Sequence, residues 1–232
     1  MNLVLLEEDE LGAAGKVRLT GRRREHVLAV HRAAVGDALT VGLLGGKIGR
    51  GTITSLDPLE MEIALIDDPP PPLDVTLVLA LPRPKVLNRV IAGATSLGVK
   101  RIYLINAWRV EKSYWKSPRL SEENLREQRI LGLEQARDTI LPSLELRRLF
   151  RPFVEEELAS IARGTRAVVA HPYAASVLPS VLSGPMTLAI GPEGGFIAKE
   201  IESLQAIGFE AMTLGPRILR VETAVTAILG RM

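Results

Sequence analysis

Hydrophobic and polar positions follow two different patterns along this chain of 232 residues. In the first part, short apolar runs separated by turn residues predict strands at residues 3–6, 16–19, 38–44, 48–55 and 61–66. Gly45 and Gly46 predict a hairpin turn. One short helix, at residues 22–31, interrupts the strands. The pattern is typical of a small β-barrel.

From residue 74 onward, strands alternate with helices. We expect strands at residues 75–81, 101–105, 144–150, 167–170, 186–190 and 209–214, and helices at 85–97, 121–138, 154–162, 198–207 and 222–229. This alternation predicts an α/β fold with a mostly parallel sheet covered on both faces. The prolines at 69–72 cannot continue a helix or a central strand. We therefore predict domains at residues 1–68 and 74–232, joined by a linker at 69–73.

Two of the predicted strands end in loops that are suited to ligand binding. Residues 191–195 read GPEGG, and residues 215–223 read GPRILRVET. One such turn is usually only a turn, and arginine near glutamate is usually a surface ion pair. Two of them at the carboxyl ends of neighbouring strands indicate a site, because ligands bind there in open α/β sheets. Neither loop matches a dinucleotide fingerprint or a phosphate loop, so nicotinamide and nucleoside-triphosphate chemistry are unsupported.

The composition narrows the class of protein. The hydrophobic fraction of 47% is enough for real cores, and the absence of cysteine excludes disulfides and thiolate metal sites. The histidines, His26, His31 and His171, lack metal-ligand spacing, so we expect no metal. No apolar run approaches the roughly 18 residues that span a bilayer. We expect a soluble cytoplasmic protein that does not enter a membrane.

The positive charge is concentrated in two segments. The net charge is only +2, but within residues 11–56 Lys and Arg outnumber acidic residues by eight to two. This predicts an RNA-facing surface, although each arginine alone is equally compatible with a solvated helix start. A later loop interleaves cations with aromatics and predicts phosphate contact with base stacking, or else an ordinary exposed loop. The candidate RNA-binding residues are Arg22, Arg23, Arg24, Arg32, Arg109, Lys112, Tyr114 and Trp115.

Residues 191–196 (GPEGGF) and 214–224 (LGPRILRVETA) resemble the two signature loops of the RsmE-type ribosomal RNA methyltransferases of the SPOUT superfamily. Residues 26–32, followed by Gly36 and Asp37, are similar to the family's H-x-x-x-V-L-R and G-D pattern, with His31 in place of leucine. The resemblance implies methylation of N3 of one uridine in 16S ribosomal RNA with S-adenosylmethionine. It also implies an N-terminal PUA-like RNA-binding barrel, a C-terminal SPOUT domain with a trefoil knot, and a homodimer that uses the C-terminal helix.

The same resemblance suggests roles for individual residues. Arg220 is the candidate for the acceptor side, where a guanidinium holds a phosphate or stabilises the deprotonating imide. Glu222 either orients Arg220 or caps the C-terminal helix. His171 is as compatible with an ordinary loop histidine as with a cofactor contact, and no residue stands out as a general base. The candidate S-adenosylmethionine-binding residues are His171, Pro172, Ile190, Gly191, Pro192, Glu193, Gly194, Gly195, Leu214, Gly215, Ile218, Leu219 and Thr223.

Several positions depart from the family pattern. Gly93 and Ser96 replace charged residues, Asp138 replaces an arginine, Ala107-Trp108-Arg109 replaces S-E-R, and Val221 replaces a common threonine. These departures fall on the side where we expect RNA. The sequence therefore predicts the type of reaction more firmly than it predicts the RNA substrate. A SPOUT methyltransferase acting on another base or on a ribose hydroxyl, and a non-catalytic RNA-binding assembly factor, remain alternatives.

Overall fold

The computed structural model describes residues 2–12, 15–29 and 32–232. The chain divides into two compact units. The N-terminal unit consists of Met1–Pro71 and Arg129–Leu141, and the C-terminal unit of Pro72–Gln128 and Pro142–Met232. The pattern of hydrophobic residues does not predict that residues 129–141 belong with the first unit. Val30 and His31, where we expected the first helix to end, lie outside the described residues.

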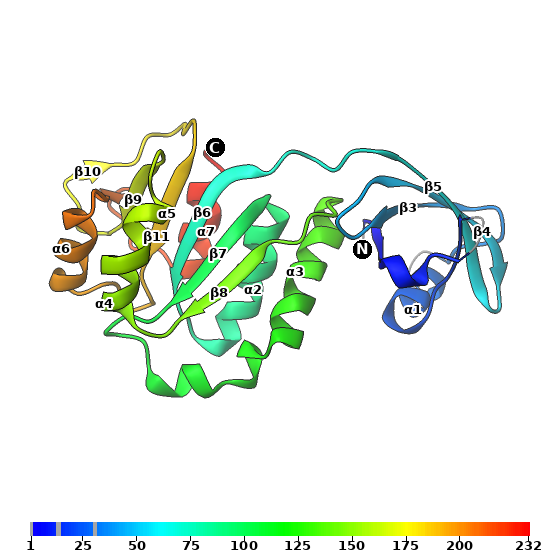
Figure 1. Cartoon of the computed structure of the whole chain (residues 1–232), viewed down its shortest axis with the longest axis horizontal. Coiled ribbons are helices and arrows are strands. Elements are labelled where there is room, and N and C mark those ends of the chain that lie inside the picture. Colours follow the sequence, from blue (N-terminus) through cyan, green and yellow to red (C-terminus); the bar gives the residue numbers. More distant parts are fainter. Residues whose placement is uncertain (1, 13–14, 30–31) are drawn as a thin grey trace. The chain divides into compact units, whose positions relative to one another are not determined.

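The N-terminal unit is built on a curled five-stranded sheet with the order β1-β3-β4-β5-β2 (Figure 1). Strand β1 pairs in parallel with β3, and the other neighbours are antiparallel. Because β1 and β2 lie at opposite edges, the expected barrel has the form of a half-barrel. The strands are β1 Val4–Leu6, β2 Lys16–Arg18, β3 Ala38–Leu43, β4 Ile48–Leu56 and β5 Leu59–Asp67, with helices η1 Glu8–Glu10 and α1 Gly21–Ala29.

Strand β1 is buried on both of its faces. Val4 and Leu6 pack into the main core of the unit. Leu3 and Leu5, which point the other way, pack against Leu133. The backbone N–H of Gly45 donates to the carbonyl of Thr139 at 2.8 Å. Residues 129–141 thus complete the N-terminal unit by covering the second face of its first strand.

The C-terminal unit contains a seven-stranded sheet with the order β10-β12-β9-β11-β6-β7-β8. Every neighbouring pair is parallel, which confirms the predicted α/β class. The strands are β6 Leu73–Ala80, β7 Val99–Ile105, β8 Ser143–Arg147, β9 Arg166–Ala170, β10 Ser176–Val177, β11 Met186–Ile190 and β12 Glu210–Thr213. The central strand β11 is buried at every position, as expected for a parallel strand covered on both faces.

Helices cover both faces of this sheet (Figure 1). Helix α2 connects β6 to β7, and the helices that follow β8 connect it to β9. The elements are α2 Pro84–Ser96, η3 Lys112–Lys116, η4 Pro118–Leu120, α3 Glu122–Ala136, α4 Phe150–Pro152, the π-helical η5 Phe153–Leu158, α5 Ala159–Ile161, α6 Ala198–Ala206 and α7 Val221–Leu229. Helix α3 begins in the C-terminal unit, and its residues from Arg129 onward belong to the N-terminal unit.

Two details of this unit differ from the prediction. The strand expected at 144–150 ends at Arg147, because Leu149 is 67% exposed and Phe150 turns into the core as the first residue of α4. The short edge strand β10 was not predicted, because both of its residues are exposed and show no alternation. No helix in the described part of the chain is both long and apolar enough to cross a bilayer.

Helix α7 is not an exposed apolar surface. The resemblance implies a homodimer that uses this helix, which would leave apolar residues on its surface in one copy. Val225, Ile228 and Leu229 are instead buried within the C-terminal unit, where α7 packs against α2. The apolar face of α7 is therefore used inside the unit, and the homodimer rests on the family resemblance alone.

Candidate functional site

Three loops at the carboxyl edge of the parallel sheet enclose a cavity of about 450 Å³. Ala170 at the end of β9 is in register with Ile190 of β11 and with Met212 of β12, so the loops that follow emerge side by side. The lining residues are Arg109, Ala170, His171, Pro172, Tyr173, Ile190, Gly191, Pro192, Glu193, Gly194, Gly195, Phe196, Met212, Thr213, Leu214, Arg217, Ile218, Leu219, Arg220, Val221 and Ala224. The two signature loops and the segment with the candidate contacts His171 and Pro172 thus meet in one cavity.

The first signature loop depends on close approach of backbone to backbone. A Cβ atom on Gly191 would lie 2.9 Å from the backbone nitrogen of Phe196 and 3.3 Å from the carbonyl carbon of Gly195. Backbone atoms cannot rotate away as a side chain can, so glycine is required there. Within the loop, the N–H of Gly195 donates to the carbonyl of Pro192 at 2.7 Å, which closes a tight turn.

Gly194 makes a similar approach to a side chain. Its carbonyl accepts a hydrogen bond from the guanidinium of Arg109, and a Cβ atom on it would lie 2.9 Å from Cδ of Arg109. Arg109 was predicted as an RNA contact, and the structure places it in the wall of the cavity.

Thr213 holds two of the loops together. Its hydroxyl lies 3.0 Å from the carbonyl of Gly215 and 3.3 Å from that of Pro172, and it accepts from the N–H of Gly215 at 3.2 Å. The N–H of His171 donates to the carbonyl of Met212 at 2.8 Å. The loops after β9 and β12 are therefore fixed by hydrogen bonds. The sequence analysis missed Thr213, because a single threonine in a strand carries no motif.

Two carboxylates anchor the first signature loop and its surroundings. Oε1 of Glu193 accepts from the backbone N–H of Arg83 at 2.9 Å, just before α2. The buried carboxylate of Glu200 accepts from the N–H of Trp108 at 2.7 Å and from the N–H of Ile197 at 3.0 Å. Glu200 therefore ties the segment around Trp108 to the start of α6. It was not predicted, because a glutamate in the first turn of a helix is common.

The candidate acceptor-side residues are separated by the structure. Arg220 lines the cavity, whereas Glu222 does not. Glu222 lies in the first turn of α7 and forms an ion pair with Arg89 at 3.8 Å. Its position favours the role at the start of the helix over the role of orienting Arg220. Gly215 and Thr223, both predicted cofactor contacts, also lie outside the set of lining residues.

His171 lies half-buried directly after β9 and lines the cavity. Its ring makes an edge-to-face contact with Tyr173 at a centroid distance of 5.8 Å. Burial lowers the pKa of His171 below its ordinary value of 6.5. The imidazole is therefore neutral near pH 7. In the described part of the chain, no group of three or more acidic or histidine side chains is arranged to hold a metal ion.

Comparison with known proteins identifies the family. Residues 69–232 match the model of the RNA methyltransferase domain family. The ribosomal RNA small subunit methyltransferase E of Synechocystis is 30% identical and aligns over 93% of this chain and 72% of the relative. That of Treponema pallidum is 29% identical over 98% of this chain and 88% of the relative. The chain belongs to the ribosomal RNA small subunit methyltransferase E family.

Solved structures of other proteins are similar to this family member over nearly its full length. The ribosomal RNA small subunit methyltransferase E of Neisseria gonorrhoeae, bound to S-adenosylmethionine, superposes with a TM-score of 0.77 at 25% identity. That superposition covers 99% of this chain and 95% of the other. A protein of Legionella pneumophila, described as a methyltransferase in complex with the same cofactor, gives a TM-score of 0.78 at 25% identity with the same coverage.

In this member of the methyltransferase E family, the aromatic loop is more enclosed than predicted. Trp115 donates from its indole N–H to Oδ1 of Asn106 at 2.9 Å, and the guanidinium of Arg148 lies 5.4 Å from its ring centroid. The hydroxyl of Tyr114 donates to Glu111 at 3.1 Å. Both rings pack partly against the core, and Lys112 is exposed. One face of Trp115 is thus already covered by a protein group.

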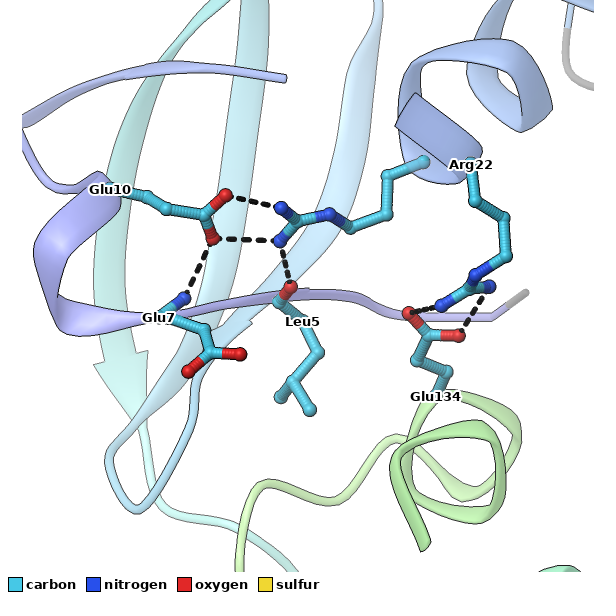
Figure 2. A network of polar contacts seen from close by, with 6 residues as sticks. Leu5, Glu7, Glu10, Arg22 and Glu134 are labelled. Atoms are coloured by element: carbon cyan, nitrogen blue, oxygen red, sulfur yellow. Dashed lines mark hydrogen bonds and ion pairs between the residues drawn. The ribbon is translucent and has the colours of Figure 1, made fainter. Parts of the chain in front are cut away.

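The predicted cationic cluster of the N-terminal unit is divided among different partners (Figure 2). Arg22 forms two hydrogen bonds of 2.9 Å with the carboxylate of Glu134. Arg23 forms a bidentate pair with Glu10 and also donates to the carbonyl of Leu5 at 2.6 Å. The remaining two cations are more accessible: Arg24 makes only a 3.5 Å contact with the exposed Asp57, and Arg32 is exposed.

The pair of Glu10 and Arg23 perturbs both groups. Burial raises the pKa of Glu10, but hydrogen bonds from Arg23 and from the N–H of Glu7, together with the charge of Arg23, lower it overall. The hydrogen bond to Glu10 raises the pKa of Arg23 against the opposing effect of burial. Both groups therefore remain charged at neutral pH, and Arg23 serves the internal structure of the unit.

Two departures from the family pattern have local explanations. Asp138, in place of an arginine, is buried and accepts from the N–H of Ile140 at 2.9 Å, so it stabilises the turn after α3. Ser96 donates to the carbonyl of Gly93 at 2.9 Å near the end of α2. These residues shape the ends of helices and do not line the cavity.

Proposed function

We propose that this protein is an S-adenosylmethionine-dependent methyltransferase that modifies N3 of a uridine in 16S ribosomal RNA of the small subunit. The observation that carries the proposal is the convergence of three strand-end loops on one cavity. The relatives named ribosomal RNA small subunit methyltransferase E, and the two structures that contain the cofactor, support the same activity.

The cavity suits this cofactor in size and in chemistry. Its walls combine glycine backbone with apolar side chains, of which Ile218 and Leu219 are 69% and 37% exposed. Apolar side chains left open in a concave site favour a flat heterocycle such as adenine. We assign cofactor binding to the predicted residues that line the cavity, and we assign to Gly215 the positioning of Thr213. When bound, the cofactor supplies an electrophilic methyl group.

The acceptor side depends on Arg220. Arg220 lines the cavity, and the fixed positive charge of an arginine can stabilise the negative charge that grows on the uracil as N3 loses its proton. Arginine cannot take that proton, which we assign to solvent. N3 thus exchanges a proton for the methyl group. N3 lies on the pairing edge, so the uridine must be unpaired or flipped out when it reaches the cavity.

The remaining expectations belong to the same proposal. We propose that residues 1–68 form a PUA-like RNA-binding domain joined through residues 69–73 to the catalytic domain at 74–232. Arg24 and Arg32 are its more accessible cationic residues. Following the resemblance, we also propose a trefoil knot in the C-terminal unit, a homodimer and a cytoplasmic location. Light scattering coupled to size-exclusion chromatography measures the mass of the particle and so tests the dimer.

Two measurements test the activity. Isothermal titration calorimetry should show one binding site for S-adenosylmethionine per chain, and a folded protein that does not bind millimolar cofactor would remove the enzyme proposal. Mass mapping of 16S ribosomal RNA from a strain lacking the gene should show one uridine without its methyl group. Restoration by the wild-type gene, but not by an Arg220→Ala variant, excludes a purely structural assembly factor. A missing methyl group on another base or on a ribose would reassign the acceptor.

A further inference from the structure

We propose that Trp108 is a stacking platform for a base of the RNA, an inference that rests on the function proposed above. Trp108 is 79% exposed, although tryptophan is normally buried over most of its surface. It is one of only two tryptophans in the chain. The resemblance gave it no role, since it stands where the family pattern has a glutamate.

The backbone that carries this indole is fixed. Its N–H donates to Oε1 of the buried Glu200 at 2.7 Å, and Oε2 of the same carboxylate accepts from the N–H of Ile197 at 3.0 Å. Ile197 follows Phe196, the last residue of the GPEGGF loop that lines the cavity. An exposed aromatic side chain on a fixed backbone loses little conformational entropy when it binds, because only two side-chain torsions remain to be ordered.

The position of Trp108 is close to the reaction. The next residue, Arg109, lines the cavity and donates to the carbonyl of Gly194. Consecutive Cα atoms are about 3.8 Å apart, so the Cα atom of Trp108 lies one residue spacing from a residue of the cavity wall. A uridine drawn out of its stack leaves its neighbours without a stacking partner, and an aromatic side chain can replace that partner. Arg109 adds a positive charge that favours the phosphate backbone.

The surroundings of Trp108 favour RNA over a protein partner. Among the described residues at 106–120, Trp108 is the only large hydrophobic side chain that is exposed. Its neighbours along the chain include Arg109, Glu111 and Lys112, all exposed. A protein interface is built from contiguous apolar side chains, whereas a single aromatic among cations is typical of single-stranded RNA recognition.

Because the chain has only two tryptophans, the fluorescence of each can be measured in a variant that lacks the other. Trp108 is open, whereas Trp115 is held by Asn106 and covered by Arg148. In a Trp115→Phe variant, only Trp108 fluoresces, and titration with transcribed 16S ribosomal RNA in the presence of cofactor should quench the emission strongly. In a Trp108→Phe variant, the remaining emission should change little. If the RNA binds and the Trp115→Phe emission does not fall, the inference is wrong.

The kinetics of RNA methylation provide a second test. Trp108→Ala should lower kcat/KM for RNA roughly 5- to 150-fold, mainly through KM, because loss of one stacked base weakens binding by that factor. The affinity for S-adenosylmethionine should be unchanged, and Trp108→Phe should retain most of the activity. Leu149→Ala is the control, since it removes another exposed apolar side chain that does not line the cavity and should leave all parameters unchanged.

The outcomes separate this inference from the proposed function. Wild-type kinetics in Trp108→Ala would overturn the stacking role and leave the methyltransferase proposal intact. If the unaltered protein methylates no 16S ribosomal RNA, the function itself fails. If Trp108→Ala dissociates a dimer and the RNA titration shows no quenching, Trp108 belongs to a protein contact and the inference is wrong. Thermal unfolding of both Trp108 variants confirms that they are folded.

Discussion

The cavity of the C-terminal unit and the arginines of the N-terminal unit show how differently two sequence signals correspond to structure. The cavity signal consisted of glycines and prolines at strand ends, and the structure brings those loops together. The arginine signal was a count of charges, and the structure pairs Arg22 and Arg23 with carboxylates of their own unit. A motif that permits a particular backbone path constrains geometry. A count of charges does not say which group each charge faces.

Arg220 differs from Arg22 and Arg23 in that it has no carboxylate partner in the part of the chain that the structure describes. Within the described residues it forms no ion pair, and it lines the cavity beside two exposed apolar side chains. An arginine without an internal partner is available to a ligand, whereas one in a bidentate pair first has to break that pair. Accessibility therefore distinguishes candidate ligand-binding cations better than their density in the sequence.

The largest effect should come from Arg220→Ala. Loss of one fixed charge aimed at a developing anion lowers kcat about 100- to 1000-fold. The affinity for S-adenosylmethionine should remain within about twofold, because cofactor binding is assigned to the loop backbone. Single-turnover methylation and calorimetry measure the two quantities separately. Undiminished turnover would show that the acceptor side lies elsewhere.

The next effect concerns the backbone of the first loop. In Gly191→Ala, the new methyl group meets backbone atoms of Gly195 and Phe196, so the loop must shift. We expect a loss of roughly 100-fold in cofactor affinity, since displacements of about 1 Å have effects of that order. The matched control is Gly93→Ala in α2, where nothing lies within 4 Å of the new Cβ. That variant should bind cofactor normally and be up to about 1 kcal/mol more stable. Equal affinities in the two variants would contradict a backbone-built site.

A smaller effect tests the N-terminal pairing. Arg22→Ala leaves the carboxylate of Glu134, whose side chain is only 3% exposed, without its bidentate partner. The free energy of unfolding should fall by about 2 kcal/mol, as is typical for a lost charged hydrogen bond. Arg24→Ala, which removes a long contact to an exposed aspartate, should cost about 0.5 kcal/mol or less. Denaturant titrations give both values. Normal stability with weaker RNA binding in Arg22→Ala would mean that Arg22 opens toward phosphate.

The smallest effect is a difference in pH response. Burial lowers the pKa of His171 below 6.5, so the unfolded chain takes up this proton more readily than the folded protein. Above pH 6.5 the histidine is neutral in both states, and the free energy of unfolding is unaffected by its titration. As the pH falls through 6.5, the unfolded chain binds the proton first, so the free energy of unfolding decreases. The pKa of Glu10 is lowered from 4.5, so its contribution is lost only as the pH falls below that value. Melting temperatures of wild type and His171→Asn should run parallel above pH 6.5 and should diverge as the pH falls below that value. Parallel curves throughout would exclude the His171 effect.

Much of the fold could be predicted because its signals are local. Strand β11 is apolar except for the buried Thr187, and every predicted strand of both units is present. The covering of β1 by residues 129–141 could not be predicted, because it joins segments far apart in the sequence through ordinary leucines. The edge strand β10 has no hydrophobic pattern of its own.

The candidate site, like the fold, could be predicted where its residues form a local motif. Its glycine loops carry a motif, whereas Thr213 and Glu200 act through hydrogen bonds to backbone that leave no spacing in the sequence. Arg109 was recognised as a functional candidate but assigned to RNA, because its contact with Gly194 depends on tertiary structure. Loops that carry a glycine motif were easier to predict than the residues that hold those loops in place.

The division of the N-terminal unit into two segments affects how the protein is made. Strand β1 leaves the ribosome early, but Leu133, which covers Leu3 and Leu5, is synthesised only after α2 and β7. The first unit therefore cannot finish folding during synthesis until residues 129–141 have emerged, and its apolar strand stays open in the meantime. A fragment that ends at residue 71 would keep that face exposed permanently, so it should aggregate unless residues 129–141 are supplied as a separate peptide.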